Sequence, residues 1–365
     1  MEMKKMKIWI ATGGTGGHIF PALSVAEELV RQGQRVIISS DGRMMGLVKK
    51  NKPARAGTAF VWAAGVGAKN KVHQTLALMK IGISAFALSL RFMIFRPDRV
   101  VAFGGYASVP VILAARIWKI PALLHEQNAA IGRANKFALR WVDVLMISFP
   151  EVKGMENKAE GRRQKAEGLK IVYTGLPVRK EFMSPSIVNK ESEFGVLVTG
   201  GSLGAQILDD VAPSAVALLP SALKKKLFVV HQTRPENVAR LQRFYASNGV
   251  KANVLSFIRD MANEVAAADL VLGRSGASTV AELQTIGRPA ILVPLSINPD
   301  QAANAESFAA SGGGITIAQS KFTTKWLTAT LDELFSNPAR LKKMAAKAKI
   351  SNDAVAKIVE EILKK

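Results

Sequence analysis

Short apolar runs alternate with longer amphipathic stretches along most of the chain. In the first half the short runs predict strands at 8–11, 35–39, 59–62, 99–103, 122–125 and 142–147. The longer stretches between them predict helices at 21–32, 44–51, 72–94, 108–118 and 131–140. Because this alternation is typical of parallel sheets that are covered by helices, it predicts a doubly wound α/β unit.

The second half repeats the alternation. Strands are predicted at 195–199, 227–231, 252–257, 270–272, 290–294 and 315–318, and helices at 205–218, 235–247, 278–286, 301–311, 323–335, 338–348 and 351–364. A chain of 365 residues is too long for one ordinary core. We therefore expect an α/β protein with two Rossmann-like doubly wound domains that face each other across a cleft. We place the domains at 1–178 and 179–349, with 181–193 as the linker and a final helix, about 350–365, packing back on the first domain.

A glycine-rich turn follows the first strand. Gly13, Gly14, Gly16 and Gly17 precede His18, and the next helix is predicted to open near Pro21, where the missing N–H of proline costs nothing. The turn departs from the dinucleotide pattern G-x-G-x-x-G, because Ile19 occupies the position of the third glycine, and it lacks the Lys-Ser/Thr of a P-loop. A tight connection explains one or two glycines, whereas four indicate a phosphate or diphosphate site.

Three later stretches repeat the order of strand, glycine turn and helix. They are FGGYASVP (103–110), VLVTGGSLGA (196–205) and GRSGASTVAE (273–282). Carboxyl ends of parallel strands share one edge of a sheet, where open α/β sheets bind ligands. Glu282 could bind the two vicinal hydroxyls of a ribose there, or it could only complement the helix dipole.

His18 is a candidate catalytic residue. A helix N-terminus disfavours the imidazolium ion, so a ring at this position stays neutral near pH 7, as a general base toward a sugar hydroxyl requires. A purely structural histidine remains the alternative.

Charge and composition limit the classes of partner and the cellular location that we expect. The net charge is +22, and residues 1–180 hold 29 basic and 11 acidic side chains against 21 and 17 in the remainder. The first half should therefore attract an anionic partner, which could be nucleic acid, lipid headgroups or a phosphorylated substrate. The chain contains no cysteine, and its apolar N-terminal stub is too short for a signal peptide, so we expect a cytoplasmic protein.

The most hydrophobic run is 75–95. Lys80 and Arg91 interrupt it and leave ten uncharged residues between them, which makes it a poor membrane-spanning helix. It could be a core helix or an amphipathic helix that rests on anionic lipid. The basic and aromatic residues that favour the second interpretation are Lys69, Lys71, Arg96, Arg99, Trp118 and Lys119.

Two rival functions fit parts of the pattern. A nucleotide-dependent oxidoreductase could use Asp41 on a ribose, but the broken glycine fingerprint weakens it. A nucleic-acid-binding protein rests on charge alone, since only 7% of residues are aromatic and no recognition motif occurs. The sequence has no Asp-x-Asp and the four histidines lack ligand spacing, so we expect no metal and no cofactor.

Six segments occur in an order that resembles a known family. They are GGTGGHIFPAL (13–23), FGGYASVP (103–110), HEQN (125–128), GLPVR (175–179), GGSLGA (200–205) and RSGASTVAE (274–282). Over residues 7 to about 318 the chain resembles the MurG family of bacterial peptidoglycan N-acetylglucosaminyltransferases. That family has the GT-B fold and transfers GlcNAc from UDP-GlcNAc to undecaprenyl-diphosphate-linked MurNAc-pentapeptide (lipid I), which gives lipid II.

The resemblance implies roles for individual residues. It implies a donor site made by Thr15, Gly16, Gly17, Asn128, Arg179, Ser202, Ile258, Ala277, Ser278, Thr279, Glu282 and Gln301, with Arg179 and Ser202 at the diphosphate. It implies an acceptor-diphosphate site made by Gly13, Gly14, Gly104, Gly105 and Tyr106, and His18 as the candidate base. Leu176, Leu203 and the stretch before Gln301 depart from the family pattern, which bears on donor stringency.

The resemblance also implies a mechanism and a location. The expected reaction is an inverting single displacement in which Arg179 and the helix start at 202–206 stabilise the departing UDP without a metal. Another UDP-sugar-dependent GT-B transferase is the alternative. The expected partners are UDP-GlcNAc, lipid I and an anionic membrane surface, without nucleic acid, and the expected location is the cytoplasmic face of the cell membrane as a peripheral protein.

Overall fold

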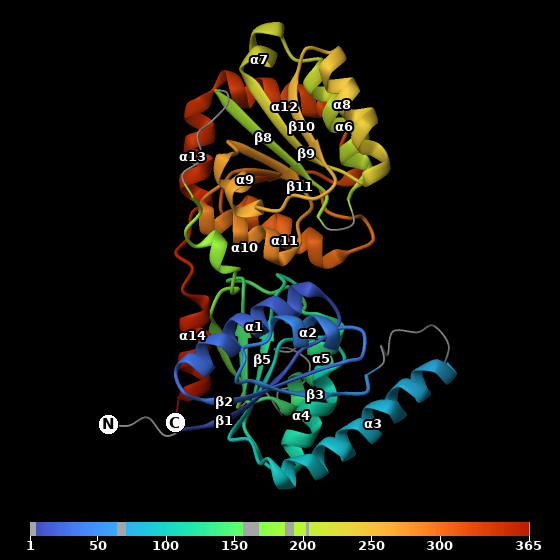
Figure 1. Cartoon of the computed structure of the whole chain (residues 1–365), viewed down its shortest axis with the longest axis vertical. Helices are drawn as coiled ribbons and strands as arrows, with labels where there is room; N and C mark the ends of the chain where they lie inside the picture. Colours follow the sequence, from blue (N-terminus) through green and yellow to red (C-terminus); the bar gives the residue numbers. More distant parts are fainter. Residues whose placement is uncertain (1–4, 64–70, 156–167, 187–192, 202–203, 365) are drawn as a thin grey trace. The chain divides into compact units, whose positions relative to one another are not determined.

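The computed structural model describes residues 5–63, 71–155, 168–186, 193–201 and 204–364. The chain divides into two compact units (Figure 1). Unit 1 comprises Met1–Arg179 together with Asn352–Lys365, and unit 2 comprises Lys180–Ser351.

Unit 1 is built on a seven-stranded parallel sheet in the order β3-β2-β1-β4-β5-β6-β7. Its strands are β1 (Lys7–Ala11), β2 (Arg35–Ser40), β3 (Gly57–Phe60), β4 (Arg99–Ala102), β5 (Ala122–Glu126), β6 (Val144–Ile147) and β7 (Lys170–Tyr173). Its helices are α1 (Gly16–Arg31), α2 (Met45–Asn51), α3 (Lys71–Ile94), α4 (Ser108–Ile117), α5 (Arg133–Ala138), the 3₁₀ turn η1 (Leu139–Trp141) and α14 (Ala354–Leu363).

Alternating side chains of β1 show why this sheet is covered on both faces. Ile8 and Ile10 belong to one buried layer, with residues of α1 and α14. Trp9 and Ala11 belong to the other layer, with residues of α3 and α4. Successive strand side chains point to opposite faces, so the four consecutive apolar residues Ile8–Ala11 require helices on both sides.

Helix α14 completes the first of these layers. Ile358 and Ile362 are fully buried in it. Lys170 Nζ of β7 pairs with Glu361 Oε1 at 2.5 Å, and Arg99 Nη2 donates to the carbonyl of Lys364 at 2.8 Å. The end of the chain therefore folds as part of unit 1.

Unit 2 is built on a six-stranded parallel sheet in the order β10-β9-β8-β11-β12-β13. Its strands are β8 (Phe194–Thr199), β9 (Leu227–Gln232), β10 (Lys251–Leu255), β11 (Leu270–Gly273), β12 (Ala290–Leu292) and β13 (Gly314–Thr316). Its helices are α6 (Gln206–Ala217), α7 (Ser221–Lys226), α8 (Val238–Ser247), α9 (Met261–Ala267), α10 (Ala277–Ile286), α11 (Pro299–Ala310), α12 (Thr324–Ser336) and α13 (Pro338–Ala348), with 3₁₀ turns η3 (Lys180–Phe182), η4 (Pro235–Asn237) and η5 (Gln319–Lys321).

The prediction of two Rossmann-like α/β halves is confirmed, but the expected start of the first helix is wrong. Helix α1 begins at Gly16, with Thr15 in extended conformation at its N-cap, so Pro21 lies inside the helix. Proline at that position deprives the carbonyl of Gly17 of its hydrogen bond. The helix tolerates this loss because Ile19, Ala22 and Leu23 bury its inner face.

The sequence interpretation also missed strand β7. The strand lies at the edge of the sheet, and none of its four side chains is buried. Three of the four residues are apolar or aromatic and do not alternate with polar ones, so no period-two pattern marks them. Its pairing with β6 is a tertiary feature.

Candidate active site

The two glycine turns of unit 1 are packed against each other. They follow β1 and β4, which are neighbours in the sheet. A Cβ atom on Gly105 would lie 2.7 Å from the carbonyl oxygen of Gly13, so the two backbones touch. Gly104 and Gly105 both have positive φ, at 79° and 75°. The turns thus share one edge of the sheet, and the predicted acceptor-diphosphate glycines lie together there.

His18 lies beside both turns, in the first turn of α1. Its Nδ1 is 3.1 Å from Thr15 Oγ1, and its ring lies against Gly104, where a Cβ would come within 2.8 Å of Cδ2. Burial lowers the pKa of His18 to about 4, which keeps the imidazole neutral over the physiological range. A neutral imidazole is what the sequence predicts for His18, and in the structure burial lowers its pKa.

Buried polar atoms without hydrogen-bond partners gather at the same edge. Among the described residues, Thr12 Oγ1, Ser40 Oγ and Gln127 Oε1 are such atoms. Ser40 Oγ lies 3.7 Å from a Cβ position on Gly13, and Gln127 Oε1 lies 3.2 Å from one on Gly104. Unpaired buried groups are costly, and they cluster where solvent or a ligand binds. These atoms therefore support a ligand site at the two glycine turns.

A polar cluster at the end of β5 fixes the HEQN segment. Glu126, 1% exposed, accepts hydrogen bonds from the backbone N–H groups of Asn128 (3.0 Å) and Gly132 (2.9 Å) and from Asn135 Nδ2 (2.7 Å). Burial raises the pKa of Glu126 above its ordinary value, against the opposing effect of these donors. The carboxyl group therefore sets the position of Asn128, a predicted substrate-binding residue.

His125 extends this cluster inward. Its Nδ1 faces Gln127 Nε2 at 3.1 Å, and its Nε2 faces the carbonyl of Gly175 at 3.0 Å. Because the Gln127 amide nitrogen donates, His125 carries its proton on Nε2 and is neutral. Burial lowers its pKa to about 4. Sequence reasoning singled out only Asn128 here, although the chain HEQN already placed His125, Glu126 and Gln127 at a strand end.

The remaining predicted residues of unit 1 occupy different surroundings. Gly16 and Gly17 form the first turn of α1. Tyr106 is partly buried and packs on the cluster of Ile81, Val109 and Ala134. Arg179 is the last residue of unit 1 before the chain enters unit 2.

In unit 2 the two predicted nucleotide loops leave neighbouring strands. Strands β8 and β11 pair up to Thr199 and Gly273, and a Cβ on Gly273 would lie 2.9 Å from the Thr199 carbonyl oxygen. We call residues 200–205 the donor loop, of which the structure describes 200, 201, 204 and 205. Gly201 and Gly204 have φ values of 74° and 67°. Ser202, a predicted diphosphate ligand, and Leu203 lie outside the described residues.

Helix α10 follows the second loop. Its N-cap residue is Gly276, which has no side chain to cap the helix, so the first-turn N–H groups of Ala277 and Ser278 face a ligand or solvent. Ser278 and Glu282 are four residues apart and share one face of the helix. The predicted phosphate and ribose contacts on this helix therefore lie on one side of it.

Gln301 is joined to the same loop. Ser275 Oγ donates to the Gln301 carbonyl at 2.7 Å, and Asn304 Nδ2 donates to the Ser275 carbonyl at 3.1 Å. Gln301 Oε1 accepts from the Leu295 N–H at 3.0 Å, which fixes the turn before α11. The structure thus brings Gln301 to the α10 loop, whereas Ile258 lies buried in the separate turn after β10.

Sequence reasoning overlooked Arg274 in this loop. Its Nη1 donates to the carbonyl of Val293 at 2.8 Å, and burial lowers its pKa. The guanidinium therefore links the α10 loop to the segment after β12. The sequence contained a signal for this residue, because Arg274 comes just after a predicted strand and precedes a glycine turn of the kind that binds phosphate.

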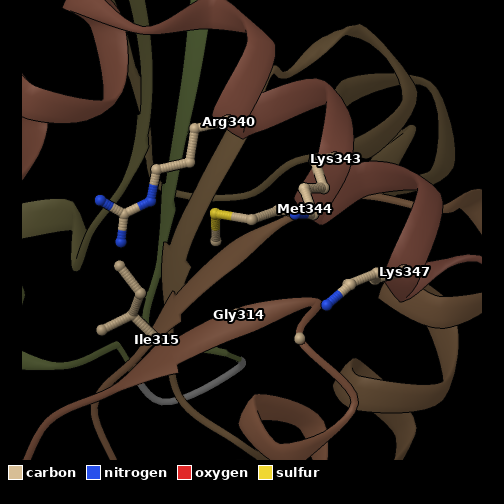
Figure 2. Close-up of a pocket in the computed structure, with 7 residues that line it drawn as sticks. Gly314, Ile315, Arg340, Lys343, Met344 and Lys347 are labelled. Carbon is tan, nitrogen blue, oxygen red and sulfur yellow. The ribbon is translucent and has the colours of Figure 1, made fainter.

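Two of the cavities that the described residues of unit 2 form are large enough for a small ligand. One of about 620 Å³ lies between Ile207 of α6, the loop 294–299 and the residues after β13. Another, of about 400 Å³, lies between β13 and α13, and Figure 2 shows Arg340, Lys343 and Lys347 around Gly314. None of the predicted site residues lines either cavity. Within the described residues, no group of three or more His, Cys, Asp or Glu could hold a metal ion.

Asp41, the ribose candidate of the oxidoreductase alternative, has a local role. Its Oδ1 accepts from the N–H groups of Arg43 (3.1 Å) and Met44 (3.2 Å), and its Oδ2 pairs with Arg43 Nη2 at 2.8 Å. The side chain therefore holds the turn that leads into α2.

Comparison with protein families and relatives points to one family. The glycosyltransferase family 28 N-terminal domain matches residues 8–147, and the family 28 C-terminal domain matches residues 195–362. A relative from Methylobacterium sp. (strain 4-46) is 40% identical over 358 residues, which are 96% of this chain and 93% of the relative. One from Mesorhizobium japonicum is 41% identical over 95% of this chain and 91% of the relative. Both are named UDP-N-acetylglucosamine–N-acetylmuramyl-(pentapeptide) pyrophosphoryl-undecaprenol N-acetylglucosamine transferase.

Solved structures agree with this assignment. The crystal structure of MurG from Acinetobacter baumannii matches with a TM-score of 0.79 at 31% identity, covering 99% of this chain and all of the other. UDP-GlcNAc 2-epimerase from Neisseria meningitidis, bound to UDP-GlcNAc, matches with a TM-score of 0.66 at 16% identity, which shows a shared fold alone. The chain therefore belongs to glycosyltransferase family 28 and, within it, to the MurG family.

Proposed function

We propose that this protein transfers GlcNAc from UDP-GlcNAc to undecaprenyl-diphosphate-linked MurNAc-pentapeptide and so makes lipid II for peptidoglycan. The observation that carries the proposal is the near full-length identity of about 40% to relatives named for this reaction. The glycine turns and polar residues described above are the groups that such a reaction needs.

Unit 2 binds the donor in this proposal. The uncapped start of α10 receives phosphate oxygens, and Glu282 accepts hydrogen bonds from the ribose hydroxyls. Gln301 binds GlcNAc hydroxyls, and Ile258 offers its backbone to uracil. Support comes from the links that join the α10 loop to Gln301 through Ser275.

Unit 1 binds the acceptor diphosphate in this proposal. Gly13, Gly14, Gly104 and Gly105 form a backbone surface without side chains, as close approach of a diphosphate requires. Tyr106 lies beside them. The unpaired buried atoms Thr12 Oγ1 and Gln127 Oε1 support a ligand at this edge.

His18 acts as the general base. A hydroxyl oxygen of the acceptor sugar attacks the anomeric carbon of GlcNAc, the bond from that carbon to the diphosphate breaks, and the hydroxyl proton passes to the imidazole. The departing UDP carries the electron pair of the broken bond, and Arg179 and the donor loop stabilise its negative charge. Thr15 and Asn128 orient the donor sugar.

Helix α3 attaches the protein to a membrane surface in this proposal. The segment Thr75–Ile94 is long and apolar enough to cross a membrane, with a mean hydropathy of 1.6. However, Leu88 and Phe92 are buried in the core of unit 1, and Trp118 Nε1 donates to Ser89 Oγ at 2.8 Å. Because these contacts hold one face of α3 to the protein, we infer that it lies on the bilayer rather than spanning it.

The opposite face of α3 is apolar and exposed. Its exposed large side chains are Leu76, Leu78, Met79, Ile83, Phe86, Leu90, Met93 and Ile94. An exposed apolar surface of this kind on a basic unit fits an anionic bilayer. In this proposal the protein lies at the cytoplasmic face of the cell membrane, next to its lipid-linked acceptor.

The test is release of UDP from UDP-GlcNAc with and without a short-chain lipid I analogue. The proposal requires release that depends on the analogue and a product that contains GlcNAc. Equal turnover with UDP-glucose would instead indicate another UDP-sugar transferase. This outcome is worth testing because Leu176 and Leu203 depart from the family pattern at positions that bear on donor stringency. Absence of turnover with any UDP-sugar would contradict the proposal.

A further inference from the structure

The cavity of about 400 Å³ between β13 and α13 lies at one edge of the sheet of unit 2. Gly312 and Gly314 line it, at the point where β13 begins. Gly314 is level with Ala290 of β12 and, through it, with Val271 of β11. The predicted nucleotide loops instead follow the carboxyl ends of β8 and β11. The cavity therefore lies toward the amino ends of the parallel strands, apart from the proposed donor site.

Three basic side chains of α13 form one wall of this cavity. They are Arg340, Lys343 and Lys347. Their spacing of three and four residues places them on one face of the helix. Figure 2 shows Arg340 extending toward Ile315 and Lys347 extending toward Gly314. The helix thus directs a row of cations at the start of β13.

The charge of this wall is only partly neutralised. Arg340 Nη1 pairs with Glu333 Oε1, and no acidic side chain lines the cavity among the described residues. Within the same part of the chain, neither Lys343 nor Lys347 pairs with a carboxylate. Three cations against one nearby carboxylate leave an excess of two positive charges. An anionic ligand would be attracted to this cavity.

The opposite wall is made of the backbone of an edge strand. The Ala290 N–H donates to the Gly313 carbonyl at 3.3 Å, and the Ile317 N–H donates to the Leu292 carbonyl at 3.1 Å. The backbone groups of alternate residues therefore face β12, and those of Gly314 face away from it. Because Gly314 lines the cavity, its N–H group adds a hydrogen-bond donor on this side.

Glycine at position 312 allows a lysine to lie against this backbone. A Cβ there would come within 2.6 Å of Lys347 Cδ and 3.1 Å of its Nζ, so any larger residue would displace the ammonium group. Met344, 8% exposed, and Ile315 supply the apolar part of the lining. Apolar surroundings reduce the screening of charges by water and so strengthen their attraction for an anion.

We propose that this cavity is a second anion site, which binds a soluble ligand that carries two adjacent phosphate groups. Arg340 and Lys347 are seven residues apart, which is about 10 Å along the helix, so a single phosphate cannot contact both. A diphosphate can accept hydrogen bonds from the guanidinium at one end and from the ammonium groups at the other. The inference stands on unit 2 alone and does not depend on the proposed transferase reaction.

A methyl group inside the cavity provides a local probe. We would isotope-label the methionine methyl groups of the full chain, assign the Met344 signal with Met344→Leu, and titrate with inorganic pyrophosphate at constant ionic strength. The Met344 signal should shift to saturation with a Kd on the order of 1 mM. The double variant Lys343→Ala/Lys347→Ala should weaken this binding about tenfold, because it removes two charged donors at an exposed site. Inorganic phosphate should bind more weakly than pyrophosphate to the wild type.

The double variant Lys342→Ala/Lys325→Ala is the matched control. It removes the same charge from exposed lysines that do not line the cavity, and we expect no change in the Kd for pyrophosphate. Equal weakening in this control, or a Met344 signal that does not saturate in the millimolar range, would overturn the inference.

Two further measurements separate this site from other anion sites. Binding to phosphatidylglycerol vesicles that requires Lys343 and Lys347, without any response to pyrophosphate, would assign the cavity to a lipid headgroup and overturn the inference. Release of UDP from UDP-GlcNAc by the Lys343→Ala/Lys347→Ala protein should equal that of the wild type. If this variant lost turnover together with pyrophosphate binding, the cavity would be part of the donor site rather than a second site.

Discussion

The carbonyl oxygen of Gly13 lies where the Cβ of any residue other than glycine at position 105 would be, at 2.7 Å. This contact joins the turns after β1 and β4 into one backbone surface. Gly105→Ala should therefore force the turns apart, with the added strain of a positive φ at 75°. We expect kcat with the lipid I analogue to fall at least tenfold and Tm to fall by several degrees.

Gly82→Ala provides the control for that substitution. Gly82 lies in α3 with no atom within 4 Å of its Cβ position, so alanine there should leave activity unchanged and slightly stabilise the helix. Wild-type kcat in Gly105→Ala would show that the turns do not form the acceptor site.

His18 should affect the chemical step more than donor binding. His18→Ala removes the proposed base, so we expect kcat to fall about 10²–10⁴-fold while the KM for UDP-GlcNAc changes less than threefold. Thr15→Val removes the partner of Nδ1 and should cause a smaller loss of kcat. A His18→Ala enzyme with normal kcat would assign the base to another group.

The pH dependence of activity provides a separate check. A base whose pKa is lowered to about 4 stays neutral down to that pH, so the acidic limb of kcat/KM should lie near pH 4 to 5 rather than near 6.5. The profile should be measured with the lipid I analogue over the range in which the protein remains folded. A limb near pH 6.5 that disappears in His18→Ala would contradict the burial described here.

His125 should make unfolding stability depend on pH. Its folded pKa of about 4 lies below the unfolded value of 6.5, so the unfolded state binds the extra proton and stability falls as the pH drops from 6.5 toward 4. The loss from this group is about 3 kcal/mol once the pH is below both values. Urea unfolding at pH 7.5 and at pH 5, which lies between the two pKa values, measures the larger part of this loss.

The comparison with His125→Gln isolates this effect. Glu126, whose pKa is raised, has the opposite sign, because its stability contribution is lost as the pH rises through the folded pKa. The difference between wild type and His125→Gln removes that contribution. An identical pH dependence in both proteins would show that His125 does not titrate as described.

A negative charge introduced on the exposed face of α3 should weaken membrane binding. Phe86 and Leu218 are both 66% exposed, but only Phe86 lies on α3. Burial of one large apolar side chain contributes about 1.5–3 kcal/mol, so Phe86→Asp should weaken binding to phosphatidylglycerol vesicles at least tenfold. Leu218→Asp should bind as the wild type does, and both variants should keep their activity on a short-chain acceptor in detergent-free solution.

Glu282 should act on donor binding. Glu282→Gln keeps the size of the side chain but removes its charge, so we expect the KM for UDP-GlcNAc to rise about tenfold with little change in kcat. With 2′-deoxy-UDP the difference between the wild type and Glu282→Gln should be smaller, because only the contact with the 3′-hydroxyl remains. A loss confined to kcat would indicate a role other than ribose binding.

The sequence alone determined the fold class and the places where ligands can approach the backbone. Apolar strands that alternate with amphipathic helices can be buried only in parallel sheets covered on both faces. Clustered glycines at strand ends are needed only where backbone approaches backbone or ligand closely, as at Gly13 and Gly104. The strand–helix alternation and the glycine clusters are both local features of the sequence, so they can be recognised without a structure.

The tertiary structure decided how distant residues meet. From the sequence alone, helix α3 could be a core helix or a membrane-surface helix. The hydrogen bond from Trp118 Nε1 to Ser89 shows which face of the helix packs on the protein and which face is exposed. The contact between the turns at Gly13 and Gly105, and the packing of α14 in the layer of Ile8 and Ile10, depend on segments that lie apart in the chain. Burial and partner geometry set these features, and neither is a property of a residue's immediate neighbours in sequence.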